Sequence, residues 1–381
     1  MRDNKPVVVF IINSLGLGGA ERALNNILQA TPQHEQFNIH LILLDREQEH
    51  RIMPEFVTVH RLDSRRSLIR SVYLLAQKLS ALKPSLSVSL LVRSNVANVI
   101  VNRILHRRPA IICERMHLSS HLALQFSGLK LVLSKMIPRV VYPFASQALG
   151  VSTGVTNDLV QNFNMPKART LTIFNPYDHK QICHDGKQTN EFALSRQYIV
   201  AVGRLTKSKN FGMLIKAYYA ADCPYDLVIL GDGDSQERNK LQALIDAKNL
   251  SEKVHLAGYA NNPFSVMKNA VFYISASLNE GFPNAMLEAM VLGLPVVASN
   301  CESGPAEILA NDDTLAIDAM YPAKYGILVP TLSIDSLTQA INAMSQTDTL
   351  EHYRQMSLQR SLDFEIHKIA NQYWQNFRTF L

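Results

Sequence analysis

The feature that most constrains the fold of this chain is an alternation of short apolar runs with longer amphipathic segments, and the alternation occurs twice. In the amphipathic segments, apolar residues recur at the 3.6-residue spacing of a helix. Several of the short runs are apolar on both faces, which is typical of parallel strands covered by helices on two sides. The first set of expected strands is 7–12, 39–44, 86–91, 110–113 and 170–174.

The alternation restarts after a polar segment, 178–196, that contains few apolar residues. The second set of expected strands is 198–202, 227–230, 254–256, 271–275, 295–298 and 326–329. The sequence therefore predicts two α/β domains in tandem, joined by a linker at 178–196. A chain of 381 residues with 47% hydrophobic residues can form two hydrophobic cores. This composition excludes a disordered chain and a small protein stabilised mainly by disulfides.

Charge is distributed unevenly between the two expected domains. The chain carries 38 Lys and Arg against 32 Asp and Glu, a net charge of +6. Residues 1–180 hold 22 of the basic and 11 of the acidic side chains, whereas residues 181–381 hold 16 and 21. A basic domain joined to a mildly acidic one indicates an anionic partner for the first domain only. Nucleic acid, an anionic membrane surface and a phosphate-bearing substrate all satisfy that charge.

The cysteines and the apolar runs indicate the cellular compartment in which the protein is expected. The four cysteines lie far apart with no C-x-x-C pair, which favours reduced, mostly buried thiols over a disulfide framework or a metal site. The apolar run at 7–12 is too short for the core of a signal peptide, and no window approaches 18 uninterrupted apolar residues. We therefore expect a cytoplasmic protein whose contact with a membrane is peripheral.

A glycine-rich loop follows the first expected strand. Gly16, Gly18 and Gly19 precede the amphipathic segment 21–30, and a helix N-terminus behind such a loop suits a phosphate group. The match to the dinucleotide-binding pattern G-x-G-x-x-G is partial, because Glu21 stands where the third glycine belongs. In that interpretation Asp45, after the second strand, imitates the acid that holds a nicotinamide ribose. The alternative is a tight turn that serves only packing.

Two loops of the second domain carry candidate anion-binding and acidic groups. Gly203, Arg204 and Lys209 follow the first strand of that domain, where Arg can hold phosphate oxygens with two hydrogen bonds and Lys adds a point charge. Glu280 ends a strand-to-helix loop, and Glu288 lies eight residues later in an otherwise apolar helix. A carboxylate there needs a partner, which the paired hydroxyls of a ribose would supply. The alternatives are a solvated basic loop and a Glu on a solvated helical stripe.

Taken together, these motifs resemble the retaining GT-B glycosyltransferases of family GT4, the group 1 transferases, over essentially the whole chain. The chain is similar in particular to bacterial transferases that add GalNAc or GlcNAc to lipid-linked oligosaccharides. Each motif alone is weak, but their order and spacing together are specific. The motifs are Gly-Gly-Ala-Glu-Arg at 18–22, Asn175-Pro176, Gly203-Arg204-Leu205 with Lys209, Leu230-Gly231-Asp232-Gly233, Leu256-Ala257-Gly258-Tyr259 and the E-x7-E pattern from Glu280 to Glu288.

The resemblance implies a GT-B fold, in which two Rossmann-like domains face a cleft and a C-terminal helix crosses back onto the first domain. It implies an acceptor-binding domain at 1–177, the linker at 178–196, a donor-binding domain at 197–360 and the crossover helix at 361–381. The implied donor is a UDP-sugar, with no further cofactor and no metal ion. The residues implied to bind the donor are Gly18, Gly19, Gly203, Arg204, Lys209, Gly258, Tyr259, Glu280, Gly281, Phe282, Asn284 and Glu288.

The resemblance also assigns catalytic residues. His117, after a first-domain strand, is similar to the family's active-site histidine near the transferred sugar, and the alternative is a packed polar residue. Arg204, Lys209 and Glu280 complete the implied set. Cations and backbone N–H groups aimed at the departing nucleoside diphosphate are expected to be the largest catalytic contribution. No well-placed nucleophile is evident, so departure and attack on the same face of the sugar is the implied route to retention.

The segment 121–144 combines many aliphatic residues with Lys130, Lys135 and Arg139, which share a broad helical face. An apolar and basic surface helix can lie in the headgroup layer and attract anionic lipid. The resemblance sharpens this expectation, because some family members hold the diphosphate of a polyprenyl carrier with a basic helix in this region. Lys130, Lys135, Arg139 and Arg115 are therefore the expected acceptor and membrane residues. The alternative is a core helix with solvated lysines.

The expected function is retaining transfer of a hexose or N-acetylhexosamine from a UDP-sugar to a lipid-linked (polyprenyl-diphosphate) or surface-polysaccharide precursor, at the inner face of the cytoplasmic membrane. The alternatives are a GT-B UDP-sugar epimerase and a nicotinamide-dependent oxidoreductase using Gly16, Gly18 and Asp45. The E-x7-E loop favours transfer, and the missing third glycine counts against the oxidoreductase. Nucleic acid is not an expected partner, because the basic stretches lack interleaved aromatic residues. The sequence leaves the oligomeric state open.

Overall fold

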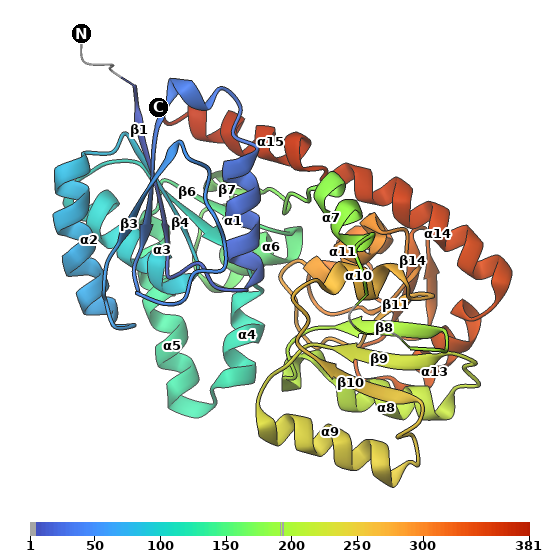
Figure 1. Ribbon diagram of the computed structural model, residues 1–381. Helices are drawn as coiled ribbons and strands as arrows, with labels where there is room; N and C mark the ends of the chain where they lie inside the picture. Colours follow the sequence, from blue (N-terminus) through green and yellow to red (C-terminus); the bar gives the residue numbers. More distant parts are fainter. Residues whose placement is uncertain (1–4, 191, 193) are drawn as a thin grey trace. The chain divides into compact units, whose positions relative to one another are not determined.

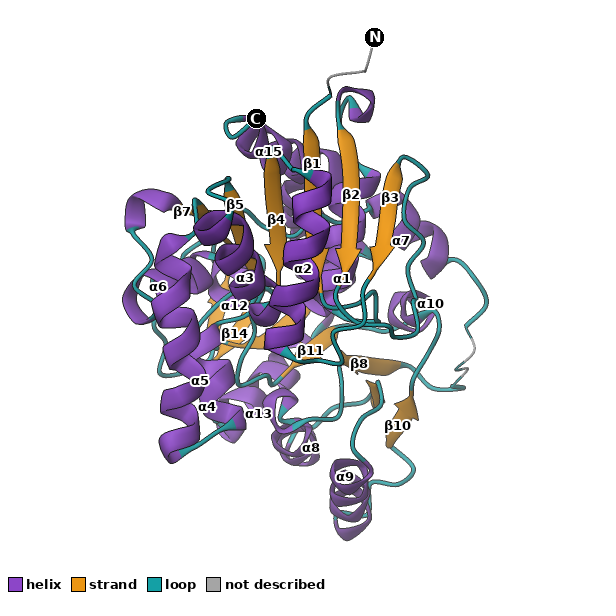
Figure 2. Ribbon diagram, turned by 90° about the vertical axis from the view of Figure 1, so that its left-hand side faces the viewer, coloured by secondary structure: helices purple, strands orange, loops and turns teal. Residues whose placement is uncertain are grey.

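The structure is a computed structural model that describes residues 5–190, 192 and 194–381. The chain divides into two compact units. Unit 1 comprises Met1–Tyr177 with Ile366–Leu381, and unit 2 comprises Asp178–Glu365. Each unit is built on a seven-stranded sheet, and helices cover the sheets (Figure 1 and Figure 2). The predicted α/β class is confirmed.

Unit 1 has the strand order β3-β2-β1-β4-β5-β6-β7, and every neighbouring pair is parallel. Strand order reverses between β1 and β4, so the topological switch point of this sheet lies there. The strands are β1 (Val7–Ile12), β2 (Asn38–Leu43), β3 (Val57–Arg61), β4 (Leu86–Leu90), β5 (Ala110–Glu114), β6 (Gln147–Gly150) and β7 (Thr170–Thr172).

The helices of unit 1 follow its strands in turn, and the last of them comes from the far end of the chain. The α-helices are α1 (Gly19–Gln29), α2 (Leu68–Leu82), α3 (Val92–Asn98), α4 (Leu118–Gln125), α5 (Gly128–Val141), α6 (Thr153–Asn162) and α15 (Ile366–Arg378). The π-helical segment η2 (Val99–Leu105) continues α3, and the 3-10 turns are η1 (His34–Gln36), η3 (Tyr142–Phe144) and η4 (Lys167–Arg169).

The core of unit 1 lies on both faces of its sheet. Alternate residues of β1 enter different hydrophobic clusters: Phe10 packs in a cluster with side chains of α1 and α15, and Ile11 packs in a second cluster with side chains of α2. Both faces of β1 are therefore buried, which is what its uninterrupted apolar run predicted.

Helix α15 completes this core. Trp374 is fully buried, and its ring contacts Phe10 edge-on at 6.1 Å and stacks on Phe37 at 4.9 Å between ring centroids. The Tyr373 hydroxyl donates a hydrogen bond to the Ile173 carbonyl at 2.9 Å. The expected return of the C-terminal helix to the first domain is confirmed.

Unit 2 repeats the architecture with the strand order β10-β9-β8-β11-β12-β14-β13. Only the edge strand β13 is antiparallel to its neighbour. The switch point lies between β8 and β11. The strands are β8 (Tyr198–Val202), β9 (Asp226–Leu230), β10 (Val254–Gly258), β11 (Tyr273–Ser275), β12 (Val296–Ser299), β13 (Tyr321–Ala323) and β14 (Gly326–Val329).

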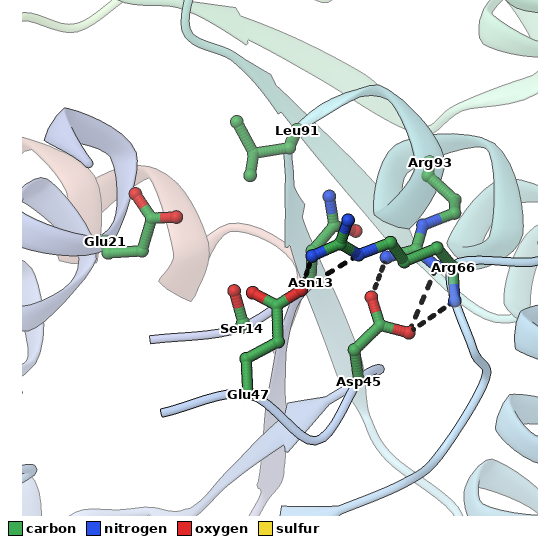
Figure 3. A pocket seen from close by; sticks show the side chains of 8 residues that line it. All are labelled: Asn13, Ser14, Glu21, Asp45, Glu47, Arg66, Leu91 and Arg93. Atoms are coloured by element: carbon green, nitrogen blue, oxygen red, sulfur yellow. Dashed lines mark hydrogen bonds and ion pairs between the residues drawn. The ribbon is translucent and has the colours of Figure 1, made fainter. Parts of the chain in front are cut away.

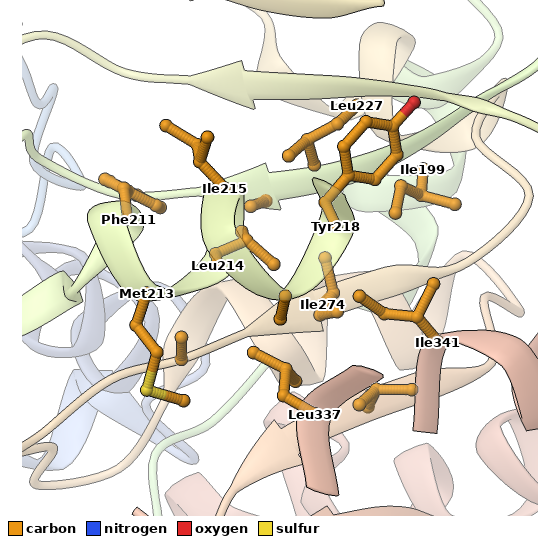
Figure 4. Close-up of a cluster of buried hydrophobic side chains, with 14 of the residues drawn as sticks. Ile199, Phe211, Met213, Leu214, Ile215, Tyr218, Leu227, Ile274, Leu337 and Ile341 are labelled. Carbon is orange, nitrogen blue, oxygen red and sulfur yellow. The ribbon is translucent and has the colours of Figure 1, made fainter. Parts of the chain in front are cut away.

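The helices of unit 2 are mostly short. They are α7 (His179–Gly186), α8 (Phe211–Ala220), α9 (Ser235–Ala247), α10 (Pro263–Lys268), α11 (Asn284–Val291), α12 (Pro305–Leu309), α13 (Ile334–Met344) and α14 (Thr347–Ser361), with 3-10 turns η5 (Lys207–Lys209) and η6 (Leu362–Phe364). Figure 4 shows the packing of one sheet face, where Leu214 of α8 and Leu337 of α13 meet Ile274 of β11.

The structure differs from the sequence-based expectations at three strands and at the linker. β3 is an edge strand in which only Val57 is buried, and β13 is a three-residue edge strand containing Pro322, so neither forms an apolar run. β6 has only four residues. The expected linker 178–196 contains α7, whose N-cap Asp178 accepts a hydrogen bond from the backbone N–H of Gln181.

Candidate functional site

The carboxyl ends of β8 and β11 bring the basic loop and the first glutamate of unit 2 together. Lys209 lies on η5, after β8, and Glu280 lies in the loop between β11 and α11. Lys209 Nζ is 2.6 Å from Glu280 Oε1, and the two side chains are 24% and 13% exposed. The backbone N–H of Leu278 donates to the Ser208 carbonyl at 2.7 Å, which ties the two loops together. This ion pair lies at the switch point of the sheet, where open α/β sheets bind ligands.

Glycines form the floor beside this ion pair. A Cβ atom on Gly203 would lie 2.9 Å from Lys209 Cε, so the lysine side chain passes directly over the glycine. Gly231 has φ +139°, and a Cβ there would lie 2.1 Å from the Gly203 carbonyl oxygen. The Gly231 N–H donates to the Gly258 carbonyl at 2.8 Å. The loops after β8, β9 and β10 therefore contact one another closely, and a side chain at Gly203 or Gly231 would collide with Lys209 or with the Gly203 carbonyl.

Arg204 and Tyr259 lie on these loops with exposed side chains. Among the residues that the structure describes, the Arg204 guanidinium has no hydrogen bond or ion pair. Gly258 has φ +74°, and nothing lies within 4 Å of the position a Cβ would take. The unit thus presents one held cation, Lys209, and one exposed cation, Arg204, near a glycine-rich edge.

The loop that carries Glu280 is fixed by a neighbouring turn. Ser303 Oγ donates to the Glu280 carbonyl at 2.8 Å and to the Gly281 carbonyl at 3.0 Å. Gly304 has φ +97°, and a Cβ there would lie 2.5 Å from Pro283 Cδ. These contacts hold the backbone that leads into α11 in one conformation.

The remaining residues of the E-x7-E stretch differ in exposure. Gly281 and Phe282 are buried, and Asn284 is the first residue of α11. Glu288 is only 4% exposed within α11. Its side chain therefore does not lie on a solvated helical stripe, which was the alternative interpretation of this residue.

In unit 1, His117 is held by side chains of α4 and α6. It is the N-cap residue of α4, and its side chain is 13% exposed. His117 Nδ1 lies 2.9 Å from Ser120 Oγ and 4.0 Å from Asp158 Oδ2. The backbone N–H of Ser119 donates to the same Asp158 carboxylate at 3.0 Å. The sequence did not single out Asp158, because no local pattern links α6 to the segment around His117.

Arg115 is buried and bridges parts of unit 1 that are distant in sequence. Its Nη1 donates to Asn175 Oδ1 at 2.7 Å and to the Tyr373 hydroxyl at 3.2 Å. These contacts join β5 to α15 and to the Asn-Pro motif. The structure therefore separates the surroundings of Arg115 from the exposed helix that carries Lys130, Lys135 and Arg139.

Glu114 was not among the residues predicted from the sequence. Burial raises the pKa of its carboxyl to about 7, although Arg115 N–H and the Tyr142 hydroxyl donate to it at 3.1 Å and 3.0 Å. A carboxyl of this kind titrates near neutral pH. Its position at the end of β5, three residues before His117, is the one signal that could have suggested it.

The glycine loop of unit 1 already holds a carboxylate. Gly18 is the N-cap of α1 and Gly19 its first residue, and a Cβ on Gly18 would lie 2.3 Å from Glu21 Oε2. A carboxylate near a helix N-terminus is stabilised by the helix dipole. Glu21 therefore lies against the loop where the sequence suggested a phosphate group.

Asp45 is also engaged. Its carboxylate accepts hydrogen bonds from Arg93, from Ser64 Oγ at 2.6 Å and from the Arg66 backbone N–H at 3.0 Å. The nicotinamide interpretation needs this carboxylate for a ribose hydroxyl pair. The contacts with Arg93 and Ser64 count against that role.

Helix α5 is a surface helix, and it carries the three basic residues predicted to contact a membrane, Lys130, Lys135 and Arg139. Pro138 is its only buried residue. Several large apolar side chains are exposed, with Leu129 at 74% and Val140 at 60%. The alternative interpretation, a core helix with solvated lysines, does not fit this exposure. Within the described residues, no helix is both long and apolar enough to cross a bilayer.

Asp232 and Asp234 lie in the turn between β9 and α9, and both carboxylates accept hydrogen bonds from nearby backbone N–H groups. Asp232 Oδ1 accepts from the Gly233 N–H at 2.9 Å, and the Asp234 carboxylate caps α9 by accepting from the Gln236 N–H at 2.9 Å. Across the described ranges, no group of three or more His, Cys, Asp or Glu side chains is arranged to hold a metal ion.

Comparison with known proteins places these features in a family. The profile described as "Glycosyl transferases group 1" matches residues 185–359. A Campylobacter jejuni protein, N-acetylgalactosamine-N,N'-diacetylbacillosaminyl-diphospho-undecaprenol 4-alpha-N-acetylgalactosaminyltransferase, is 31% identical over 369 residues, which are 94% of this chain and 96% of that protein. The lipopolysaccharide 1,6-galactosyltransferase of Escherichia coli is 28% identical over 44% of this chain and 46% of its own length.

Solved structures share the whole fold. HepE of Anabaena, determined in complex with UDP, matches with a TM-score of 0.75 at 20% identity, over 98% of this chain and 99% of its own. A sucrose-phosphate synthase of Thermosynechococcus elongatus matches with a TM-score of 0.79 at 17% identity, over 99% of both chains. At these identities the likeness shows the fold, which is the expected GT-B fold.

Proposed function

The chain belongs to the group 1 glycosyl transferases, and from that premise we propose that it transfers a hexose or N-acetylhexosamine from a UDP-sugar, with retention of configuration, to a lipid-linked or surface-polysaccharide precursor. The observation that carries the donor half of this proposal is the Lys209–Glu280 ion pair on its glycine floor at the β8/β11 switch point, with Arg204 exposed beside it. UDP is the ligand named for the structural neighbour HepE, which supports a uridine donor.

In the proposed reaction, the leaving UDP carries away negative charge as the glycosidic bond breaks. Lys209 and Arg204 neutralise its diphosphate, and Glu280 keeps the Lys209 ammonium in place before the donor arrives. Such preorganised charge costs no rearrangement at the moment of reaction, which makes it effective in catalysis. The buried Glu288 carboxylate binds the ribose hydroxyls, and the backbone of Gly281, Phe282 and Asn284 lies along the donor sugar.

Two further features of the proposed reaction follow from these cations. Arg204 and Lys209 supply the charge that a divalent ion supplies in other transferases, so we propose that turnover needs no metal ion. His117, held by Ser120 and near Asp158, lies close to the transferred sugar in the proposed complex. The incoming hydroxyl then attacks the face from which UDP leaves, and its proton passes to the departing diphosphate oxygen.

Helix α5 supports the acceptor half of the proposal. Its exposed apolar side chains and its cations Lys130, Lys135 and Arg139 suit the interface of an anionic membrane and a diphosphate headgroup. The Campylobacter relative is named for an undecaprenyl-diphosphate acceptor, which agrees with this chemistry. We therefore place the protein peripherally at the inner face of the cytoplasmic membrane. The epimerase alternative is not favoured, because the relatives described above are named as transferases.

The proposal is tested by incubating the purified chain with UDP-hexoses and UDP-N-acetylhexosamines and a short-chain polyprenyl-diphosphate-linked sugar. We expect one donor to give a product one sugar larger by mass spectrometry, in the presence of EDTA, with the anomeric configuration of the donor by NMR. Absence of transfer from every UDP-sugar, or inversion, would contradict the proposal.

The membrane half is tested with the triple variant K130A/K135A/R139A. We expect it to lose at least tenfold in binding to vesicles containing anionic lipid, since each cation near such a surface contributes about 1 kcal/mol. The matched control K216A/K240A/K253A removes three exposed cations from unit 2 and should bind like the parent. Equal binding of both triple variants at low salt would contradict the role of α5.

A further inference from the structure

The first turn of α4 is capped by a buried carboxylate of α6. His117 is the N-cap residue of α4, but its side chain makes no capping hydrogen bond. Asp158 takes that role, because its Oδ2 accepts a hydrogen bond from the Ser119 backbone N–H at 3.0 Å and its Oδ1 accepts one from the Ser119 hydroxyl. Asn162 Nδ2 donates to the same Oδ1 at 2.8 Å. Asp158 is only 2% exposed, so its carboxylate is fixed beside the residue at which α4 starts.

Three oxygen atoms lie on the Nδ1 side of the His117 ring. Ser120 Oγ is 2.9 Å from Nδ1, Ser119 Oγ is 3.5 Å away, and Asp158 Oδ2 is 4.0 Å away. Because the Ser119 hydroxyl donates to Asp158, its oxygen can only accept from the imidazole. The negative charge of the Asp158 carboxylate favours an N–H over a lone pair at Nδ1. These contacts favour the tautomer of His117 that carries its proton on Nδ1.

The tautomer decides what His117 offers to a ligand. A neutral imidazole has one N–H donor and one acceptor nitrogen, and the partners of one nitrogen set the role of the other. A proton on Nδ1 leaves Nε2 as an acceptor, whereas a proton on Nε2 makes that nitrogen a donor. The His117 side chain is 13% exposed, so part of it remains accessible on unit 1. A sugar hydroxyl would donate to Nε2 in the first tautomer and accept from it in the second.

We propose that Asp158 is a positioning residue, which holds His117 as the Nδ1–H tautomer and so makes Nε2 the acceptor for a hydroxyl group of the transferred sugar. The contact with the sugar rests on the transferase function proposed above, whereas the tautomer depends on contacts within unit 1 alone. Asp158 acts through His117 and does not touch the sugar. In serine proteases, loss of the carboxylate that orients the catalytic imidazole lowers kcat about 10⁴-fold through the wrong tautomer. Two serines share the task here, so we expect a smaller effect.

The tautomer is tested by NMR of the full chain labelled with nitrogen-15 in its histidines, at about pH 8.5, where a histidine side chain is ordinarily neutral. H117Q lacks the ring and identifies the His117 signals among those of the 12 histidines. We expect a protonated Nδ1 in the parent chain. D158N keeps an oxygen that can accept from the Ser119 N–H but removes the charge, so the Nε2–H tautomer should become populated. A parental tautomer in D158N would contradict the proposal.

Ser120 is the competing candidate, because its oxygen is the nearest of the three to Nδ1. S120A removes that oxygen and retains the Asp158 carboxylate. We expect S120A to keep the Nδ1–H tautomer. A tautomer shift in S120A without one in D158N would assign the positioning role to Ser120 and overturn the role of Asp158.

Asp45 provides the matched control for the loss of a buried carboxylate. It is 6% exposed and pairs with Arg93 in the pocket shown in Figure 3. It follows β2, which lies three strands away from β5, the strand that leads to His117, in the order β2-β1-β4-β5. D45N should therefore destabilise the chain without changing the His117 tautomer. A shift in D45N as large as that in D158N would show that a general loss of stability is the cause, and the proposal would be wrong.

The kinetic test uses the UDP-sugar and the lipid-linked acceptor of the transfer assay. D158N should lower kcat about tenfold, the effect of one misdirected hydrogen bond, while D45N, assayed below its thermal midpoint, should keep the parental kcat. A parental kcat in D158N despite a shifted tautomer would overturn the contact between His117 and the sugar. If the parent transfers no sugar and D158N still shifts the tautomer, the transferase function fails and the positioning of His117 by Asp158 stands.

Discussion

The two units carry the same kind of crevice with opposite chemistry. In unit 1 the β1/β4 crevice holds the Asp45–Arg93 pair, with further carboxylates around it. In unit 2 the β8/β11 crevice holds the Lys209–Glu280 pair, with glycines below it and an exposed arginine beside it. One sheet topology thus places three carboxylates and two guanidinium groups at the switch point of unit 1, and the cations Lys209 and Arg204 with the carboxylate of Glu280 at that of unit 2. Loop residues, and not the strands, make this difference.

The two ion pairs also differ in how tightly they are held. Asp45 accepts hydrogen bonds from three residues, and its partner Arg93 also contacts Ser64. Glu280 holds Lys209 through a single contact, and a lysine ammonium on its flexible stem can move to another anion or to water. The first pair is therefore held by several neighbours, whereas the second pair is held by one contact and is the easier of the two to separate.

The largest effect is expected from removing the cation of the unit 2 pair. K209A should lower kcat by about 10²–10³-fold, because one preorganised group that stabilises developing negative charge contributes that much to turnover. K207A is the matched control, since Lys207 is an exposed lysine of the same 3-10 turn. Steady-state kinetics with the UDP-sugar measures both. Equal rates for the two variants would break the assignment of the diphosphate to unit 2.

The second prediction compares the loss of the carboxylate from the Asp45–Arg93 pair with its loss from the Lys209–Glu280 pair. D45N leaves the Arg93 guanidinium mostly buried without a counter-charge, so it should lower the free energy of unfolding by about 2–4 kcal/mol. E280Q should lower it by only about 1 kcal/mol, because Lys209 can reach solvent, while activity falls sharply. Urea denaturation followed by circular dichroism gives both values. A larger stability loss in E280Q than in D45N would reverse the comparison.

The smallest effect concerns Glu114, a buried carboxyl of unit 1 whose hydrogen-bond donors are both uncharged. Its pKa rises from 4.5 to about 7 on folding, so its contribution to stability is fully present below pH 4.5 and is lost as pH rises through 7. The loss is of order 1–3 kcal/mol. E114Q should therefore flatten the decline of the thermal midpoint between pH 5 and 8. An unchanged slope would show that this carboxyl is not the group responsible.

Much of the fold was readable from the sequence because it depends on local patterns. The uninterrupted apolar run of β1 and the helical spacing of residues 21–30, which form most of α1, predicted elements close to those observed. β3 was not predicted, because an edge strand needs no apolar run. α7 was not predicted, because a polar segment can form a helix when a residue such as Asp178 caps it. Both elements keep exposed positions, whereas β6 was missed because its four residues are too few to form a clear apolar run.

The site was predictable only in part, for a different reason. Glu280 and Lys209 were identified from motif spacing, and the structure brings them into contact. Arg93, Asp158 and Glu114 were not identified, because their roles depend on partners on other strands and helices. The position of Asp45 after the second strand suggested that its carboxylate holds a ribose. In the structure this carboxylate pairs with Arg93 instead. Burial and pairing arise from tertiary packing, which motif spacing does not encode.

Helix α15 has a consequence for how the protein is made. The ribosome delivers the strands of unit 1 first, yet the Trp374 side chain that fills their core is translated only after all of unit 2. Unit 2 is one continuous stretch and can finish folding while unit 1 still exposes the apolar face around Phe10. The unit that begins first is therefore completed last. A nascent chain halted before residue 366 should accordingly engage chaperones through unit 1.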